Sequence, residues 1–315
     1  MPIEQKIQQN VVLAPFTTFK IGGPAKFFVE VKSKEELSGA IGWARENKEN
    51  FFVLAGGSNV LINDNGVRGL VVKISNNDLK VKGERIECGA GARLAAAASL
   101  AIGQNLTGLE WSIGIPGATV GGAVVGNAGA FAAAMSDIVE TVEAFNAEKK
   151  KFEILSNRDC EFGYRDSVFK KKKGLILWSV VLRLKKEKPE IIRELVKQSV
   201  DFRQNKYPKL PSAGSVFKNI PLEKIKEKNP VLAKEISERG AVSGGLVGAG
   251  AIIDMLGLKG KAIGGAKISL EHANHIVNTG KAAAGDVVML ISYIKQQARD
   301  KFGIQLNEEV RYLGF

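Results

Sequence analysis

The first third of the chain alternates apolar and polar residues with the periods of strands and helices. The segment 26–31 (KFFVEV) has strand composition, and Ser33 is a typical N-cap for a helix over 34–48. Within that helix Leu37, Ile41 and Ala44 fall on one apolar face. Further strands are expected at FFVLAG, VLI, GLVVKI and IECGA, followed by an Ala-rich helix near 92–103.

The second half continues this mixture of strands and helices. Strands are expected near 138–155 and at 175–184, and the charged stretch KKEKPE (185–190) has the composition of a linker. We therefore place the domain boundary there, between 1–187 and 188–315. A helix over 190–203 would open the second domain, and an amphipathic helix over 284–302 and the strand EEVRYLG would close it. The charged segment 223–243 is expected to be an exposed helical excursion. The whole predicts an α/β (α+β) protein.

Composition adds a preference for anionic partners. The 315 residues are 45% hydrophobic and 25% charged, typical of a globular protein of two or three domains, and the net charge is +12. A positive field suits nucleic acid, an anionic membrane or a phosphorylated small molecule. Because aromatic and basic residues are not interleaved and no nucleic-acid-binding motif occurs, a phosphate-bearing small molecule is the expected partner.

Several classes of site are not expected. Cys88 and Cys160 match no metal or redox spacing, and His272 and His275 lack the carboxylate or cysteine ligands of a metal site, so we interpret them as structural histidines. The polar start resembles no signal peptide, and no run of about 18 apolar residues occurs. We therefore expect a cytoplasmic protein without metal or membrane insertion.

The turn Gly56-Gly57-Ser58-Asn59 lies between two apolar runs, FVLA and VLI. It could join a β-hairpin, since Gly-rich turns with Asn often do. Alternatively, its backbone N–H groups could form a concave anion site, because glycine allows a phosphate close to the backbone. Taken alone, the turn favours the hairpin.

A second glycine-rich stretch occupies 114–129, where glycine is interspersed with Ile, Val, Ala and Phe. Flexible linkers combine glycine with polar residues, so this stretch is expected to pack against another backbone or a ligand. It contains neither a dinucleotide-binding G-x-G-x-x-G nor a P-loop. Together with the turn at 56–59 it favours a phosphate-bearing cofactor, held from two sides, over plain turns.

Three polar clusters are candidates for chemistry. Arg165 in FGYRDSVF is either part of a surface turn or a cation for a carboxylate or enolate. Ser215 in PSAGSVFKN lies in no nucleophile-elbow frame, and a strand serine usually fills a structural niche. Glu308 and Glu309 adjoin the final strand, and only one of them can face a given side.

Seven motifs occur in the order expected of one family: TTFKIGGPA (17–25), AGGSNVLI, GIPG with GGAVVGNAGAF, GYRDSVF, AGSVFKN, GLKGKAIGGAKIS with EHANHIVN, and FGIQLNEEVRYLG. On these motifs, which span nearly the whole chain, the sequence resembles the UDP-N-acetylenolpyruvoylglucosamine reductases, flavoenzymes of peptidoglycan precursor synthesis. Two departures are a lengthening by one residue at 118–120 and an apparent insertion at 223–243.

The resemblance implies an FAD-binding domain of the vanillyl-alcohol-oxidase (PCMH) type over 1–187, with two α/β subdomains meeting near residue 75. It implies a smaller α/β substrate-binding domain over 188–315, whose last strand returns to the active site. The turn at 56–59 would then hold the FAD pyrophosphate. Only a strand, the linker and a helix are expected between Arg165 and Lys206, as in the form of the family that lacks an extra loop.

The resemblance also implies the chemistry: NADPH reduces noncovalent FAD, and the enolpyruvyl ether of a UDP-sugar is then reduced to UDP-N-acetylmuramate. Arg165 and a neutral Glu309 would contact the substrate's carboxylate and enolate, while Ser215 would donate the proton. The alternatives are a flavin oxidase and a non-catalytic flavoprotein, and the presence of these three residues argues against the latter.

The residues expected at the two binding sites follow from the same resemblance. Substrate would contact Tyr164, Lys206, Lys218 and Asn219, with Lys218 also assisting Ser215. The FAD-binding residues expected are Ala55, Gly56, Gly57, Ser58, Asn59, Val60, Ile115, Pro116, Gly117, Gly121, Gly122, Asn127 and Gly129. We expect a monomer with no nucleic-acid partner.

Overall fold

The computed structural model describes residues 2–315. The chain forms two compact units, each assembled from separate segments. Unit 1 comprises residues 2–11, 25–56 and 67–204, and unit 2 comprises 12–24, 57–66 and 205–315. Short 3-10 helices occur at η1 (Ile3–Lys6), η2 (Ala14–Phe16), η3 (Glu110–Ser112), η4 (Met135–Asp137) and η5 (Arg158–Cys160).

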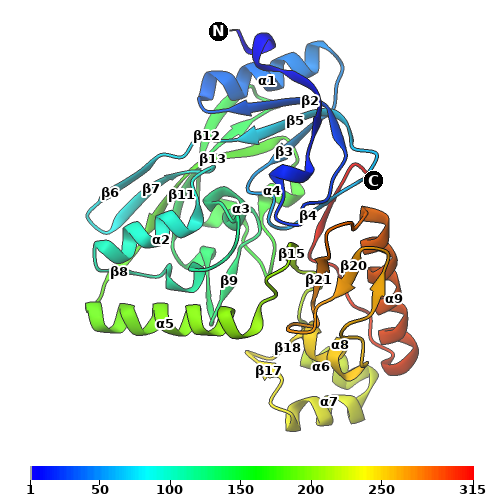
Figure 1. Ribbon diagram of the computed structural model, residues 1–315. Helices are drawn as coiled ribbons and strands as arrows, with labels where there is room; N and C mark the ends of the chain where they lie inside the picture. Colours follow the sequence, from blue (N-terminus) through cyan, green and yellow to red (C-terminus); the bar gives the residue numbers. More distant parts are fainter. Residues whose placement is uncertain (1) are drawn as a thin grey trace. The chain divides into compact units, whose positions relative to one another are not determined.

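The first sheet has the strand order β1 (Gln8–Val12), β2 (Pro24–Val31), β5 (Val67–Ile74), β3 (Phe51–Leu54). Strands β2 and β3 both run parallel to β5. Helix α1 (Lys34–Glu46) connects β2 to β3, as Figure 1 shows. The Ser33 side chain accepts a hydrogen bond from the Glu36 amide at 3.3 Å, and Leu37, Ile41 and Ala44 are buried, which confirms the predicted cap and apolar face.

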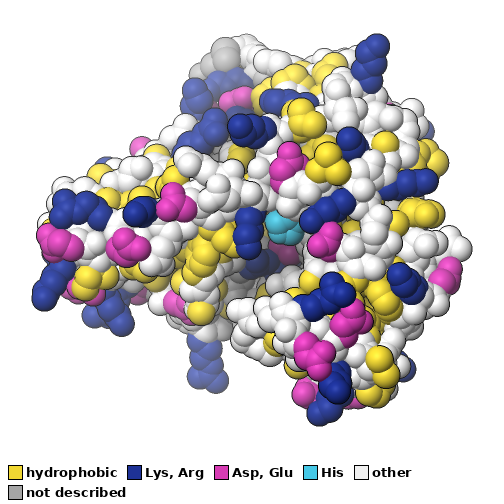
Figure 2. All heavy atoms as spheres, turned by 60° about the horizontal axis from the view of Figure 1, so that its bottom comes forward, with side chains coloured by type: hydrophobic (Ala, Val, Ile, Leu, Met, Phe, Trp, Pro, Cys, Tyr) yellow, Lys and Arg dark blue, Asp and Glu magenta, His cyan; other side chains and the backbone are white. Residues whose placement is uncertain are grey.

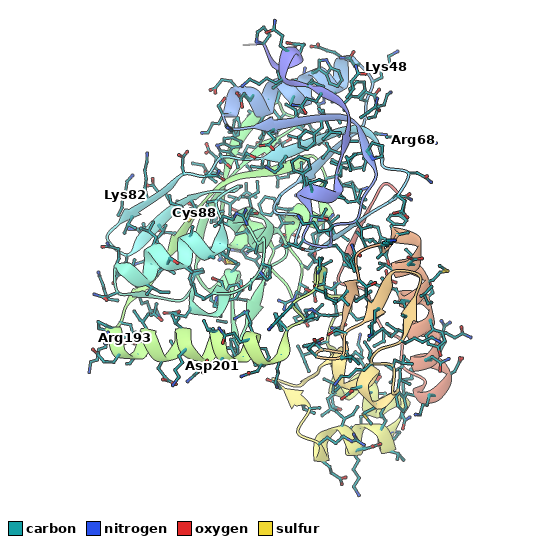
Figure 3. All side chains as sticks on the ribbon, in the orientation of Figure 1. Lys48, Arg68, Lys82, Cys88, Arg193 and Asp201 are labelled. Atoms are coloured by element: carbon teal, nitrogen blue, oxygen red, sulfur yellow. The ribbon has the colours of Figure 1, made fainter. Side chains whose placement is uncertain are left out.

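The second sheet of unit 1 is antiparallel and has five strands, in the order β12 (Lys151–Ser156), β11 (Val139–Asn146), β13 (Leu175–Arg183), β7 (Arg85–Gly89), β6 (Leu79–Lys82). The Ala-rich helix α2 (Leu94–Gly103) follows β7. Cys88 lies inside the unit, whereas Lys82 at the end of β6 points outward (Figure 3). The remaining small elements are β8 (Leu106–Thr107) with β14 (Lys185–Lys186), α3 (Val120–Val125), α4 (Val168–Lys171), and the β9 (Gly129–Ala130) and β10 (Ala133–Ala134) hairpin.

Helix α5 (Pro189–Lys206) belongs to unit 1 almost to its end, so the units change at 204/205 and not at the predicted 187/188. The cause is packing by Arg203, which is 6% exposed and donates to the Trp111 carbonyl at 2.5 Å. Between Arg165 and Lys206 the chain forms α4, β13, β14 and α5. This agrees with the expected strand, linker and helix, with α4 in addition.

Unit 2 contains three small sheets around its own apolar core. Their strand orders are β15 (Ser212–Ser215)–β21 (His275–Asn278)–β20 (Ala266–Ile268)–β19 (Ala262–Ile263), β16 (Ile220–Pro221)–β18 (Leu246–Val247)–β17 (Val242–Ser243), and β22 (Arg311–Leu313)–β4 (Val60–Ile62). Helices α8 (Ala249–Met255) and α9 (Ala284–Phe302) complete it, and α9 has the predicted bounds 284–302. The core includes Phe19 and Leu61 from the early segments.

The charged segment 223–243 forms α6 (Leu222–Lys228), α7 (Pro230–Glu238) and strand β17. Its helical character is confirmed, but it is not merely an exposed excursion. Ile225, Leu232 and Ile236 are buried in the core of unit 2, because each helix turns one apolar face inward while its lysines and glutamates face solvent. The segment is therefore an integral part of this unit.

The hairpin interpretation of 56–59 is wrong. Strand β3 before the turn pairs with β5 in the first sheet, whereas β4 after the turn pairs in parallel with β22. The two strands flanking the turn are thus in different sheets, and the turn also marks the change from unit 1 to unit 2 at 56/57. A local β-hairpin cannot explain its glycines.

The positive charge is dispersed over the surface. Figure 2 shows lysine and arginine side chains scattered among acidic and uncharged ones on the face displayed. Many lysines are paired, such as Lys82 with Glu87 at 2.7 Å and Lys149 with Glu153 at 2.9 Å. Among residues 2–315, the helices include none that is long and apolar enough to cross a membrane.

Candidate active site

In unit 2 the turn residue Gly57 is fixed by backbone contacts. Its φ is +64°, a region that favours glycine, and a Cβ there would lie 2.1 Å from the Phe16 carbonyl oxygen. The Gly57 carbonyl accepts a hydrogen bond from the Thr18 amide at 3.1 Å. Within residues 2–315 the N–H groups of Gly56, Gly57 and Ser58 donate no hydrogen bond to the protein, so they are suited to an anionic ligand.

In unit 1 the two glycine-rich stretches meet directly. A Cβ on Gly56 would lie 1.9 Å from the carbonyl oxygen of Gly117, which itself has φ +65°. Only glycine at position 56 allows these backbones to approach so closely. The contact places Gly117 next to Gly56 within unit 1, so the two glycine-rich stretches adjoin there.

The amides of Gly121 and Gly122 are used within the protein. The Gly121 N–H donates to the Ala90 carbonyl at 2.9 Å, and a Cβ on Gly121 would lie 2.7 Å from the Ala90 Cβ. The Gly122 N–H donates to the Thr119 hydroxyl, which caps α3. These two hydrogen bonds hold α3 in place. Because both amides already donate to protein acceptors, they do not support the predicted role of Gly121 and Gly122 as direct donors to FAD.

Arg165 lies at the tip of a tight loop in unit 1. Gly163 and Asp166 exchange backbone hydrogen bonds of 3.0 and 3.1 Å, so Tyr164 and Arg165 form the tip. Arg165 has φ +55°, a left-handed conformation that costs a non-glycine residue about 1–2 kcal/mol. Backbone strain of this kind is often retained at functional sites.

The Arg165 guanidinium is oriented by two carbonyl groups. Its Nη1 donates to the Asn127 carbonyl at 3.4 Å and its Nη2 to the Gly129 carbonyl at 3.0 Å. Sequence reasoning assigned Asn127 and Gly129 to FAD, and it missed this connection to Arg165. No local pattern could reveal it, because the residues are separated by more than thirty positions along the chain.

Ser215, Glu309 and Asn59 lie on adjoining backbone segments of unit 2. The Glu309 amide donates to the carbonyl of Val216, the neighbour of Ser215, at 2.7 Å. The Asn59 side-chain Nδ2 donates to the Glu309 carbonyl at 3.2 Å. The Asn59 Oδ1 is buried and has no hydrogen-bond partner among residues 2–315, which makes it a candidate acceptor for a ligand.

The two glutamates before the final strand have different surroundings. Glu308 forms an ion pair with Lys295 at 2.6 Å. The pKa of Tyr312 is raised chiefly by burial of its hydroxyl, and the nearby Glu308 carboxylate raises it further. The neighbouring Glu309 is the residue whose backbone joins the segments of Ser215 and Asn59. From the sequence, only one of the two glutamates was expected to face a given side of the strand. The ion pair of Glu308 leaves Glu309 as the candidate for the site.

The other predicted substrate residues lie in both units. Tyr164, in unit 1, is exposed, and the Arg165 guanidinium lies 5.5 Å from its ring centroid. In unit 2 Lys206 and Asn219 are exposed; the Asn219 Oδ1 accepts a 3.4 Å hydrogen bond from the Ala249 amide. The Lys218 amide donates to the Asn307 carbonyl at 2.8 Å.

The histidines form a local aromatic cluster. The rings of His272 and His275 are 4.6 Å apart, and Tyr207 lies 5.1 Å from His275. Burial lowers the pKa of His275 to about 3, so this side chain is neutral. His275 is also the cross-strand partner of Ser215. No group of three potential metal ligands occurs among residues 2–315.

Comparison with known proteins accounts for both units. Residues 25–151 match the "FAD binding domain" family, and residues 205–313 match "UDP-N-acetylenolpyruvoylglucosamine reductase, C-terminal domain". A UDP-N-acetylenolpyruvoylglucosamine reductase of Caldanaerobacter subterraneus is 38% identical and covers 99% of this chain and 95% of its own. One of Anoxybacillus flavithermus is also 38% identical, over 98% and 94% of the two chains.

A solved structure shows the same fold. The crystal structure of UDP-N-acetylenolpyruvylglucosamine reductase (MurB) from Thermus caldophilus has a TM-score of 0.78 and 34% identity, covering 98% of this chain and 99% of that one. This similarity and the FAD-binding domain match confirm the expected fold class. On identity, coverage and fold together, this chain belongs to the UDP-N-acetylenolpyruvoylglucosamine reductase family.

Proposed function

We propose that this protein is an FAD-dependent oxidoreductase, a UDP-N-acetylmuramate dehydrogenase, that uses NADPH to reduce the enolpyruvyl ether of UDP-N-acetylglucosamine enolpyruvate. Family membership supports the reaction. The main structural support comes from unit 2. There the Glu309 backbone is hydrogen-bonded to Val216, the neighbour of Ser215, and to the Asn59 side chain. A hydroxyl side chain and a carboxyl side chain thus belong to neighbouring backbone segments, next to a glycine turn.

The glycine turn fits FAD. Its backbone N–H groups at 56–58 donate no hydrogen bond within residues 2–315, so they suit a pyrophosphate. The Asn59 Oδ1 is buried without a partner among these residues, so it suits a hydroxyl or N–H donor of the cofactor. We propose that residues 55–60 and 115–117 bind the cofactor. Gly121, Gly122, Asn127 and Gly129 would not contact it directly but would stabilise the backbone of unit 1. Bound there, FAD would supply the hydride chemistry, taking a hydride from NADPH and passing it to Cβ of the enolpyruvyl group.

We assign one residue of each unit a role in stabilising the charge that develops on the substrate: Arg165 in unit 1 and Glu309 in unit 2. Hydride addition at Cβ leaves negative charge on Cα and the carboxylate. A guanidinium binds a carboxylate with two parallel hydrogen bonds, so Arg165 is suited to that group. The Glu309 carboxyl group, when it carries a proton, can donate a hydrogen bond to the enolic oxygen and so stabilise the developing anion.

Ser215 completes the reaction by delivering its hydroxyl proton to Cα. Its O–H bond breaks as the new C–H bond forms, and the resulting alkoxide recovers a proton from its surroundings before the next turnover. General acid catalysis of this kind is typically worth about 10²–10⁴-fold. Tyr164, Lys206, Lys218 and Asn219 bind the nucleotide-sugar, whose phosphates suit the two lysines.

Two half-reactions measured anaerobically test the proposal. Ser215→Ala should leave reduction of FAD by NADPH nearly unchanged and slow reoxidation by the enolpyruvyl sugar about 10²–10⁴-fold. Ser215→Cys should recover part of that rate, because a thiol can also deliver a proton. Ser212→Ala, in the same strand, is the matched control and should behave as wild type. Equal slowing of both half-reactions by Ser215→Ala would show that Ser215 shapes the flavin site instead.

We also propose that the enzyme works as a cytoplasmic monomer, since its substrates are phosphorylated metabolites and both predicted binding sets come from one chain. Sedimentation analysis of the FAD-loaded protein should give the mass of one 33.9 kDa chain plus cofactor. A concentration-independent mass of twice that value would refute the monomer.

A further inference from the structure

Asn127 is the centre of a hydrogen-bond network in unit 1. Its Nδ2 donates to the Gly163 carbonyl at 2.9 Å, and its Oδ1 accepts from the Ser136 amide, also at 2.9 Å. The residue is 8% exposed and has φ +41°, a left-handed conformation that asparagine tolerates better than most residues. Each end of the side-chain amide therefore already makes a hydrogen bond to the protein backbone, which favours a structural role for this side chain.

Asn127 contacts both the loop that carries Arg165 and the Arg165 side chain. Through its side chain it anchors Gly163, the first residue of the loop whose tip is Arg165. Through its main-chain carbonyl it accepts a hydrogen bond from the Arg165 guanidinium. Because a carbonyl carries no net charge, this bond orients the cation without neutralising it.

The Arg165 backbone conformation needs such support. Its positive φ is unfavourable for a residue with a side chain, so the loop keeps this shape only if its surroundings hold it. Two further bonds assist: Lys170 Nζ donates to the Arg165 carbonyl at 2.6 Å, and Ser167 Oγ donates to the Val125 carbonyl at 2.8 Å. Asn127 is the residue among these that contacts both the loop and the guanidinium.

We infer that Asn127 is a positioning residue that fixes Arg165 for binding the carboxylate of the enolpyruvyl substrate, and is not a direct FAD ligand. The inference rests on the proposed function for the identity of that carboxylate. The positioning itself stands on the four hydrogen bonds that Asn127 and Gly129 make with Gly163, Ser136 and Arg165.

Asn127→Gly is the variant of choice, since glycine accepts the left-handed backbone and removes only the side-chain bonds. Its matched control is Asn76→Gly. Asn76 is a buried asparagine of the same unit that likewise donates to a carbonyl (Trp178, 2.7 Å) and accepts from an amide (Gly91, 2.9 Å). Asn76 has no hydrogen bond to the 163–166 loop. Asn76→Gly therefore measures the effect of losing two buried side-chain hydrogen bonds elsewhere in unit 1.

The first measurement is amide hydrogen exchange and does not depend on activity. In Asn127→Gly the amides of Gly163 and Asp166 should exchange at least about tenfold faster relative to the rest of unit 1, because local opening is no longer opposed. In Asn76→Gly they should not. Unchanged exchange of these amides in Asn127→Gly would overturn the positioning role.

The second measurement separates substrate from cofactor. Asn127→Gly should keep its FAD affinity and NADPH half-reaction within about threefold of wild type, but weaken sugar binding and slow the sugar half-reaction about 10–100-fold, as expected for a misplaced binding group. A large loss of FAD affinity with a normal sugar half-reaction at saturating FAD would instead make Asn127 a cofactor ligand.

A double-mutant cycle completes the test. In an Arg165→Ala background, Asn127→Gly should cause less than about threefold further loss in the sugar half-reaction, since residues that act through one another are not additive. Fully additive losses would refute the inference. If Arg165→Ala alone leaves the sugar half-reaction intact, the role proposed for Arg165 fails, while hydrogen exchange still decides whether Asn127 positions its loop.

Discussion

Replacing Gly57 by alanine should destabilise unit 2 itself, beyond any effect on FAD. The new Cβ would lie 2.1 Å from the Phe16 carbonyl oxygen and 2.9 Å from the Thr17 Cα. Real Cβ atoms do not approach so closely, and both neighbours are backbone atoms, which cannot rotate away. The segment 12–24 must therefore shift, and with it the Thr18 amide that donates to the Gly57 carbonyl.

The cost has two parts. A left-handed conformation costs alanine about 1–2 kcal/mol relative to glycine. Forcing an extra carbon into a packed site typically costs a further ~1–3 kcal/mol. The free energy of unfolding should thus fall by about 2–5 kcal/mol, the sum of these two contributions.

Gly83→Ala isolates the first part. Gly83 has nearly the same φ, +62°, but a Cβ there would meet nothing within 4 Å. It should therefore lose only the conformational part, about 1–2 kcal/mol. Urea unfolding of both variants without FAD measures the difference free of any ligand effect. Equal losses in the two variants would show that the contact with Phe16 is relieved at no cost, and the reasoning would be wrong.

Four further outcomes are expected. Acid precipitation should release all flavin into the supernatant, since cofactor attachment is expected to be noncovalent; colour in the pellet would contradict this. Because burial raises the pKa of Cys88 to about 12 and of Cys160 to about 11, neither thiol should react rapidly with a thiolate-specific reagent until the protein is unfolded. The pKa of His275 is lowered on folding, so as pH falls the unfolded chain takes up this proton before the folded chain does. Stability should therefore decline below about pH 6.5, with His275 contributing at most ~1.4 kcal/mol per pH unit and His272, whose pKa burial also lowers, adding to the decline. His275→Phe should flatten that decline, and an unchanged slope would argue that another group causes it. Arg165→Lys should slow the sugar half-reaction but not the NADPH half-reaction, because an ammonium cannot make the paired bonds of a guanidinium; an unaffected sugar half-reaction would exclude the carboxylate role.

Local patterns predicted the elements whose stability is local. Ser33 and the spacing of Leu37, Ile41 and Ala44 specify α1, and the apolar period of 284–302 specifies α9 within its observed bounds. In both cases a cap or an apolar face lies within the segment itself. The family resemblance then supplied what no local pattern contains, namely the pairing of motifs far apart in the sequence.

What failed depended on distant partners. The residues around Gly57 suggested a hairpin because β4 is apolar and adjacent to β3, but β4 pairs with β22, about 250 residues later. The linker composition of 185–190 suggested a boundary, but the contact of Arg203 with Trp111 keeps α5 in unit 1. Likewise, the sequence could not show that the side-chain amide of Asn127 is hydrogen-bonded to Gly163 and Ser136.

The three-segment composition of unit 2 bears on how the protein is made. Strand β4 leaves the ribosome early, but its partner strand β22 is synthesised last. Phe19 and Leu61 also belong to a core whose α9 members, such as Ile291 and Ile294, are made late. At a translation rate of about 5–20 residues per second, β4 waits roughly 12–50 s for β22. Throughout that interval the β4 edge lacks its native partner, and the core around Phe19 and Leu61 is completed only stepwise as residues 213–310 are made. The nascent chain therefore exposes apolar surface for as long as it is being synthesised. A chain truncated before Arg311 would lack the strand that pairs with β4, so that strand edge would stay unpaired.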